Sequence, residues 1–192
     1  MRTLLARATL SAIVLLVGCT PTAPAPGPTS PAAPPTQSYY CTPDGETSGA
    51  PCSKEEYDAQ LERDRLYEEA ESVYRKLTAA EQELFRHGAP ADESVLRYVT
   101  GQARDTVVQA HESELRLVDG EARIVWIKRN PDEAKAESTV SMVACIDNTA
   151  ALSAMPGEAA RPGGHAREYM FFVNSGDGLK VTLFEYEVVD AC

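Results

Sequence analysis

The sequence predicts a single domain of the α+β class over residues 39–192, with helices first and a mostly antiparallel sheet after them. Between Ser53 and Leu117, apolar residues recur at the spacing of amphipathic helices. After Gly120 the period changes, and runs rich in β-branched and aromatic residues follow. Because consecutive strands with tight connections pair antiparallel, helices gathered before them would cover one face of the sheet. We therefore expect three helices packed on at least four strands.

Ahead of this domain, residues 1–18 predict a lipoprotein signal peptide. Arg2 and Arg7 give it a positive start, and the apolar stretch that follows is too short to span a bilayer as a stable helix. The stretch ends in "LVGC", residues 16–19, which resembles the lipobox of bacterial lipoproteins. That resemblance implies lipidation of Cys19, with acyl chains such as palmitate, and a lipid-anchored extracellular protein on the outer face of the cell membrane. The alternative is an ordinary cleaved signal that contains a buried cysteine.

Residues 19–38 predict a disordered stalk. After the cysteine the segment is almost wholly Pro, Ala, Thr, Ser and Gly, which cannot bury enough apolar surface to offset the entropy of ordering. Its prolines favour polyproline II, so at about 3.1 Å per residue it would lift a domain roughly 60 Å from the membrane, into the cell wall. The alternative is a proline-rich ligand for a partner's groove.

Charge excludes one class of partner. The chain carries 29 acidic and 18 basic residues, a formal net charge of −11, and removal of residues 1–18 takes away two arginines and no acid. Such a surface repels nucleic acid, and no basic patch opposes it.

Four cysteines remain once Cys19 is assigned to lipid: Cys41, Cys52, Cys145 and Cys192. An even number in an exported chain predicts disulfides, and four cysteines allow three pairings. The first two bracket a turn-rich segment whose closure would contribute about 3 kcal/mol, and closure between the last two would contribute about 4 kcal/mol. A zinc site is the competing interpretation, but the chain lacks CxxC spacing and a histidine cluster, so we expect no metal and no cofactor.

The helical part begins with a capping box formed by Ser53 and Glu56, followed by a long amphipathic helix. Thr78 and Glu81 repeat the capping signature, which predicts a break and a short second helix that ends before Gly88.

A third helix is expected from an N-cap at Asp92 to about Leu117, where Asp119 and Gly120 stop it. Gly101 lies within its apolar stripe and marks a kink or a boundary.

Four segments are predicted to be the strands of the sheet, and the turn "SGDG" joins the last two as a hairpin. The runs are "ARIVWIK" (122–128), "STVSMVACID" (138–147), "EYMFFVN" (168–174) and "LKVTLFEYEVV" (179–189). Between the second and third runs, residues 149–164 are rich in Gly and Pro, and with His165 they predict a mobile loop.

These segments together resemble a known family. "VTGQA" at 99–103, "VSMVACIDNTA" at 140–150 and a paired-strand finish ending in cysteine are similar to actinobacterial lipoproteins of the NTF2-like superfamily. The resemblance implies a cone, in which a curved sheet wraps around the helices and leaves a cavity, and a disulfide between Cys145 and Cys192. The chain departs from the pattern because it shows no early strand pair between its helices, so the strand order stays open.

Members of that superfamily include enzymes that use a buried Asp, Tyr or His in the cone. Asp147, Tyr169 and Tyr186 are the corresponding pocket residues, with Trp126 as a further lining residue. Asp147 fits a turn at a strand end better than a base, and Tyr169 alternates with Phe171 on a face expected to be core. We therefore predict no catalytic residue.

No nucleophile, phosphate-binding or metalloprotease motif is present, and the three histidines are isolated. The sequence favours a lipid-anchored cell-envelope binding or interaction domain, with a small hydrophobic ligand or a basic protein docked on the acidic first helix. The alternative is a small NTF2-like enzyme that applies acid–base chemistry to a small hydrophobic substrate in the cone cavity. A third possibility is a structural envelope protein without a cavity.

Overall fold

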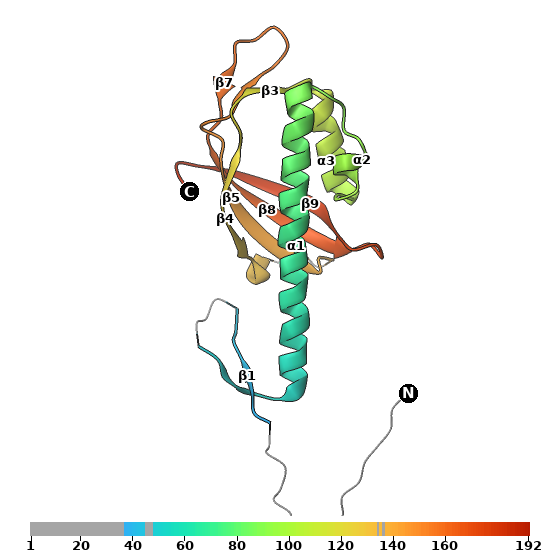
Figure 1. Ribbon diagram of the computed structural model, residues 1–192, viewed down its shortest axis with the longest axis vertical. Coiled ribbons are helices and arrows are strands. Elements are labelled where there is room, and N and C mark those ends of the chain that lie inside the picture. The colour runs from blue at the N-terminus through green and yellow to red at the C-terminus, as the bar shows by residue number, and fades with distance from the viewer. Residues whose placement is uncertain (1–36, 45–47, 134, 136) are drawn as a thin grey trace, which may run out of the picture. The chain divides into compact units, whose positions relative to one another are not determined.

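The computed structural model describes residues 37–44, 48–133, 135 and 137–192 (Figure 1). The predicted signal peptide (1–18), the predicted lipidation site Cys19 and the predicted stalk up to residue 36 lie outside the described residues. Within the described part of the chain, no helix is both long enough and apolar enough to cross a bilayer.

From Ser38 onward the chain forms one unit of the α+β class, which confirms the predicted fold class at this level. The described residues contain three α-helices and one short 3-10 helix. Strands β1 and β2 precede the helices, and the remaining strands follow them. The elements are β1 (Tyr39–Cys41), β2 (Ala50–Cys52), α1 (Lys54–His87), α2 (Glu93–Leu96), α3 (Gly101–Glu112), β3 (Arg116–Asp119), β4 (Arg123–Arg129), η1 (Pro131–Glu133), β5 (Val140–Asp147), β6 (Leu152–Ala154), β7 (Arg161–Pro162), β8 (His165–Asn174) and β9 (Leu179–Val189).

Helix α1 is one uninterrupted helix. Its capping box is confirmed, because Glu56 N donates to Ser53 Oγ at 3.2 Å and Ser53 N donates to Glu56 Oε2 at 2.8 Å. It ends at Gly88, whose φ of 58° is the left-handed conformation that glycine adopts readily. The predicted break at Thr78 is wrong, because the apolar stripe runs past that residue without a change of phase and Glu81 continues it instead of capping a new helix.

The predicted third helix is divided in two. Between α2 and α3 the backbone pairs with β9: Val181 N donates to Tyr98 O at 2.9 Å, and Thr100 N donates to Val181 O at 2.8 Å. Gly101 is therefore a boundary, with a φ of 51°, and a β-carbon on it would lie 2.8 Å from Thr182 Oγ1. This pairing attaches the short helices to the edge of the sheet.

Two further differences involve the segments around a small sheet of order β3-β6-β7. The third helix ends at Glu112 instead of Leu117, because Arg116–Asp119 pairs with β6. Residues 149–164, expected as a mobile loop, contain β6 and β7, which pair with each other. Pro156 and Gly157 form the turn between β6 and β7, whereas Pro162 is part of β7 and pairs with Leu152.

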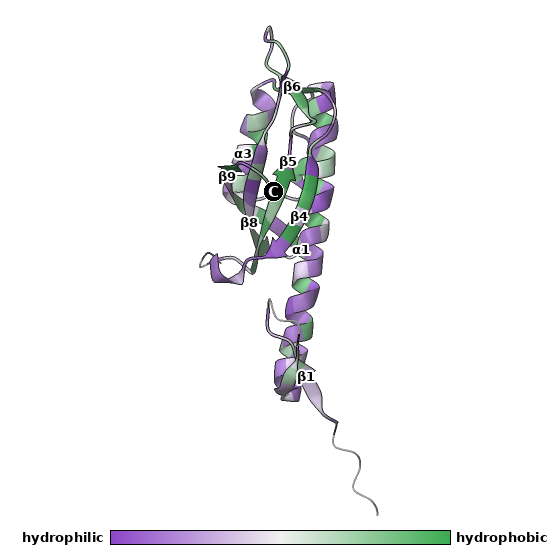
Figure 2. Cartoon of the chain, turned by 90° about the vertical axis from the view of Figure 1, so that its left-hand side faces the viewer, coloured by the Kyte–Doolittle hydropathy of each residue, from purple (hydrophilic) through white to green (hydrophobic). Residues whose placement is uncertain are grey.

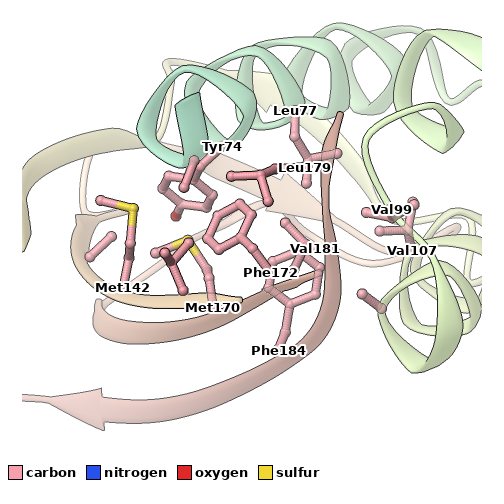
Figure 3. Close-up of a cluster of buried hydrophobic side chains, with 14 of the residues drawn as sticks. Tyr74, Leu77, Val99, Val107, Met142, Met170, Phe172, Leu179, Val181 and Phe184 are labelled. Atoms are coloured by element: carbon pink, nitrogen blue, oxygen red, sulfur yellow. The ribbon is translucent and has the colours of Figure 1, made fainter. Parts of the chain in front are cut away.

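The main sheet has the order β4-β5-β8-β9 and is antiparallel throughout, so the four predicted strands and the final hairpin are confirmed. Alternate residues of these strands face α1 and form the core with Tyr74 and Leu77 (Figure 3). Met142, Met170 and Phe172 lie in this cluster. Figure 2 shows the lower part of α1, beyond the sheet, as predominantly hydrophilic.

Both disulfides are confirmed. Cys41 pairs with Cys52 and Cys145 with Cys192, with Cα–Cα distances of 5.8 Å and 5.6 Å. The second bond does not join neighbouring strands, since β8 lies between β5 and β9. After β9 the chain turns back over the sheet (Figure 2), where Trp126 Nε1 donates to the carbonyl oxygen of Cys192 at 3.2 Å. The C-terminus is thus fixed on the face of the sheet opposite α1.

Candidate functional site

A cavity of about 450 Å³, partly open to solvent, lies between α1, the main sheet and the small sheet. Apolar side chains form most of its wall, and a group of acidic and phenolic side chains meets at one part of it. The apolar wall includes Phe85, Leu115, Leu117, Ile146, Ala151 and Ala166, and the polar group consists of Tyr74, Glu81, Glu168 and Tyr186. Among the described residues, no Lys, Arg or His lines this cavity.

Glu168 is the centre of the polar group. It lies on β8 directly opposite Tyr186 on β9, and Tyr74 Oη of α1 donates to its Oε2 at 2.5 Å. Burial raises the pKa of Glu168, although hydrogen bonds from Tyr74 and Tyr186 oppose the rise. Tyr186 exposes 61 % of its surface, yet its hydroxyl interacts with Glu168, so its ring forms part of the rim and its polar end faces inward.

Glu81 is the second carboxyl of the group. It reaches the cavity from α1, and burial together with the negative charge of Glu168 raises its pKa from 4.5 to about 8. The carboxyl makes no hydrogen bond or ion pair with any described residue, in contrast to Glu168. At neutral pH Glu81 is therefore mainly protonated, with free capacity to donate or accept a hydrogen bond toward the cavity.

Of the four pocket residues predicted from the sequence, Tyr186 lines the cavity and the other three lie elsewhere. Asp147 closes a turn after β5: its Oδ1 accepts from Thr149 N at 3.0 Å, and Arg123 Nη2 lies 3.1 Å from its Oδ2. The hydrogen bond from the Thr149 hydroxyl is the main cause that lowers the pKa of Asp147. This is the turn role that the sequence favoured over a catalytic base.

Tyr169 and Trp126 occupy the opposite face of the sheet. Tyr169 Oη donates to Glu187 Oε2 at 3.2 Å, and Trp126 holds the C-terminal carbonyl with Lys128 Nζ 4.7 Å from its ring centroid. The expectation that Tyr169 faces the core was wrong. The even-numbered residues Glu168, Met170 and Phe172 face α1 instead, so the inward face of β8 is shifted by one residue from the prediction.

Sequence reasoning missed Glu81 and Glu168, although each had a signal. Glu81 follows Leu77 by four residues and thus continues the buried stripe of α1. Glu168 precedes Met170 by two residues and shares its face. A charged residue at a core position of a helix or a strand is therefore a signal for a ligand-binding or catalytic site. The signal is strongest when the helix and the strand line the same cavity.

His111 is buried beside the cavity wall without facing the cavity. Its ring stacks on Phe85 with centroids 4.2 Å apart, and Nδ1 lies 3.0 Å from the Ala89 carbonyl oxygen. Burial lowers the pKa of His111. Across the part of the chain that the structure describes, no group of His, Cys, Asp and Glu has the arrangement of a metal site.

Several carboxylates on the acidic face of α1 are paired within the helix. Arg65 contacts both Glu62 and Glu69, at 2.7 Å and 3.0 Å, and Arg75 contacts Glu71 at 2.8 Å. These i,i+3 and i,i+4 pairs offset much of the local negative charge. The hypothesis of a basic protein partner on this face gains no support from them.

Comparisons with protein-family models, with curated proteins and with solved structures find no match to this chain. The chemistry of the cavity is therefore the basis for a functional hypothesis. Its apolar wall can bury a hydrocarbon portion, and its two carboxyls and two phenols can bind or exchange protons with a polar group.

Proposed function

We propose that this protein is a lipid-anchored cell-envelope domain with an NTF2-like cone, and that the cone binds one small, largely apolar molecule. The observation that carries the proposal is the cavity of about 450 Å³ with mostly apolar walls and one polar cluster. Ligand sites in proteins are typically concave, mainly apolar and about 300–1,000 Å³ in volume, with a few placed polar groups. The lipobox at Cys19 and the stalk would hold the domain outside the membrane, where it meets ligands of the cell wall.

The division of the cavity into two chemical regions supports binding of an amphipathic molecule. Phe85, Leu117 and Ile146 offer apolar surface, whose burial stabilises a complex by about 25 cal/mol per Å² before the costs of association. Glu81 and Glu168 provide the polar region. A ligand with one polar end would be oriented by these carboxyls.

A fluorescence titration with the neutral dye N-phenyl-1-naphthylamine tests this proposal. Ala166 lines the cavity, so Ala166→Phe should fill part of it and lower dye affinity at least tenfold. Ala59 is exposed on α1, so the matched control Ala59→Phe should leave affinity unchanged. Absence of saturable binding, or equal affinity in all three proteins under conditions where each gives the same circular dichroism spectrum, would refute cavity binding.

A second candidate function is acid–base catalysis on a small carbonyl compound. It is favoured by the raised pKa of Glu81, about 8, beside a second carboxyl in an apolar cavity. A group that titrates near the working pH is best suited to proton transfer, so Glu81 would exchange protons with the substrate while Tyr74 and Tyr186 hold Glu168.

The test is exchange of the α-protons of cyclohexanone for deuterium, followed by NMR in heavy water. The enzyme hypothesis predicts exchange that Glu81→Gln removes, whereas Glu68→Gln, which removes an exposed carboxylate from the same helix, retains it. If the unaltered protein exchanges these protons no faster than Glu81→Gln does, and still binds the dye, the enzyme hypothesis is refuted and ligand binding remains the function.

A further inference from the structure

Resting on the proposed binding function of the cavity, we propose that its ligand is an organic cation whose ammonium group is held by Glu81 and Glu168, and that binding releases a proton. The ligand class follows from the charges on the cavity wall, from the unpaired state of Glu81 and from the aromatic rings that line the cavity.

The charge of the wall has one sign. Glu81 and Glu168 reach the cavity from α1 and β8, and no cationic side chain of the described residues lines it. An anionic ligand would meet two acids without a counter-charge. A cation would meet two groups that can each supply a negative charge.

The hydrogen bonding of the two carboxyls differs in a way that leaves room for a donor. Glu168 accepts from Tyr74 at 2.5 Å and interacts with the Tyr186 hydroxyl, whereas Glu81 has no partner among the described residues. A primary ammonium group carries three N–H donors, and its hydrogen bonds to carboxylates are charge-assisted. It would supply the partner that Glu81 lacks.

Aromatic rings complete the environment for a cation. Tyr74, Phe85 and Tyr186 all line the cavity, and the electron-rich faces of such rings attract ammonium groups within about 6 Å. The same rings and the aliphatic wall would contact the hydrocarbon part of the ligand.

The proton balance follows from the state of Glu81 in the free protein. Its raised pKa keeps it mainly protonated at pH 7, and the titratable groups that share the cavity are Glu168 from β8, Tyr186 from β9 and Tyr74 from α1. When an ammonium ion binds, the O–H bond of Glu81 breaks, its proton passes to the buffer and the ammonium group keeps its own protons. A neutral carbonyl ligand would instead accept a hydrogen bond from protonated Glu81 without proton release.

Isothermal titration calorimetry with octylamine, 1-octanol and octanoate separates these cases, because the three probes share one alkyl chain. Titrations at pH 7 in phosphate and in HEPES, whose ionisation enthalpies differ, give the number of protons released. We expect octylamine to bind at least tenfold more tightly than the other two and to release about one proton. Glu81→Gln should remove the release and lower octylamine affinity at least tenfold, whereas Glu68→Gln should change neither.

Equal affinity for octylamine and octanol would overturn the cationic ligand class, and tight octylamine binding without proton release would overturn the proposed ionisation of Glu81 on binding. If the dye N-phenyl-1-naphthylamine still binds and Ala166→Phe still weakens it, cavity binding survives that result. Failure of both the dye and octylamine to bind would overturn both proposals together. The comparison of the three probes on the unaltered protein does not depend on the folding of any variant.

Discussion

Replacement of Glu81 by Gln should change how the stability of this domain depends on pH. In the unfolded chain this carboxyl loses its proton near pH 4.5, but in the fold its pKa is about 8. Between these values the folded state binds more protons than the unfolded state, so the free energy of unfolding falls as pH rises through this window. Below it Glu81 is neutral in both states and imposes no penalty.

The size of the effect follows from the same pKa. Since each pKa unit corresponds to about 1.4 kcal/mol, the rise from 4.5 to about 8 corresponds to a loss of roughly 5 kcal/mol between pH 4 and pH 9. Gln cannot ionise, so Glu81→Gln should be more stable than the unaltered protein at pH 9, by roughly 3 to 5 kcal/mol, and should differ by about 1 kcal/mol or less at pH 4.

Urea denaturation followed by circular dichroism at several pH values between 4 and 9 measures this difference. Glu68→Gln is the matched control, because Glu68 is exposed on the same helix, and its profile should run parallel to that of the unaltered protein. Parallel profiles for Glu81→Gln as well would show that this carboxyl ionises normally, and would refute the account of a desolvated acidic pair.

Three other substitutions test separate parts of the structure. Cys19→Ala should release the protein from the membrane fraction, and continued membrane association in cell fractionation would contradict the lipobox assignment. Gly101→Ala should lower the free energy of unfolding by about 1 to 3 kcal/mol, because the φ of 51° and the contact with Thr182 Oγ1 exclude a side chain; unchanged urea denaturation would argue against this geometry. Cys192→Ala should cost about 4 kcal/mol by opening the loop to Cys145, and a loss below about 1 kcal/mol would show that the C-terminus is held by other contacts.

The sequence predicted those features of the fold that local signals specify. The capping box at Ser53, the glycine stop at Gly88 and the alternation in four strands each depend on neighbouring residues, and all were found. The second capping signature, at Thr78, was misleading, because Thr and Glu at this spacing can occur inside a helix as well as at its start. Gly101 was predicted as a kink or a boundary, and it is a boundary because Val99 pairs with Val181, far along the chain, a contact that no local pattern reveals.

The candidate site was less predictable for a physical reason. The run around Tyr169 is apolar at both odd and even positions, so alternation did not show which face meets the helix, and a shift by one residue exchanged Tyr169 for Glu168. Glu81 lies in an acidic helix where most carboxylates are exposed, so its place on the buried stripe, four residues after Leu77, was a weak signal that the position of the sheet makes clear.

The central claim is that the cavity under α1 binds a small, largely apolar molecule. An NMR titration of the isotope-labelled protein with N-phenyl-1-naphthylamine tests it most directly, because it reports both binding and location. We predict saturable shifts of the backbone amide signals of Glu81, Ala166 and Tyr186, with little change at Ala59. Shifts that do not saturate, or that are absent from these cavity residues, would contradict the claim.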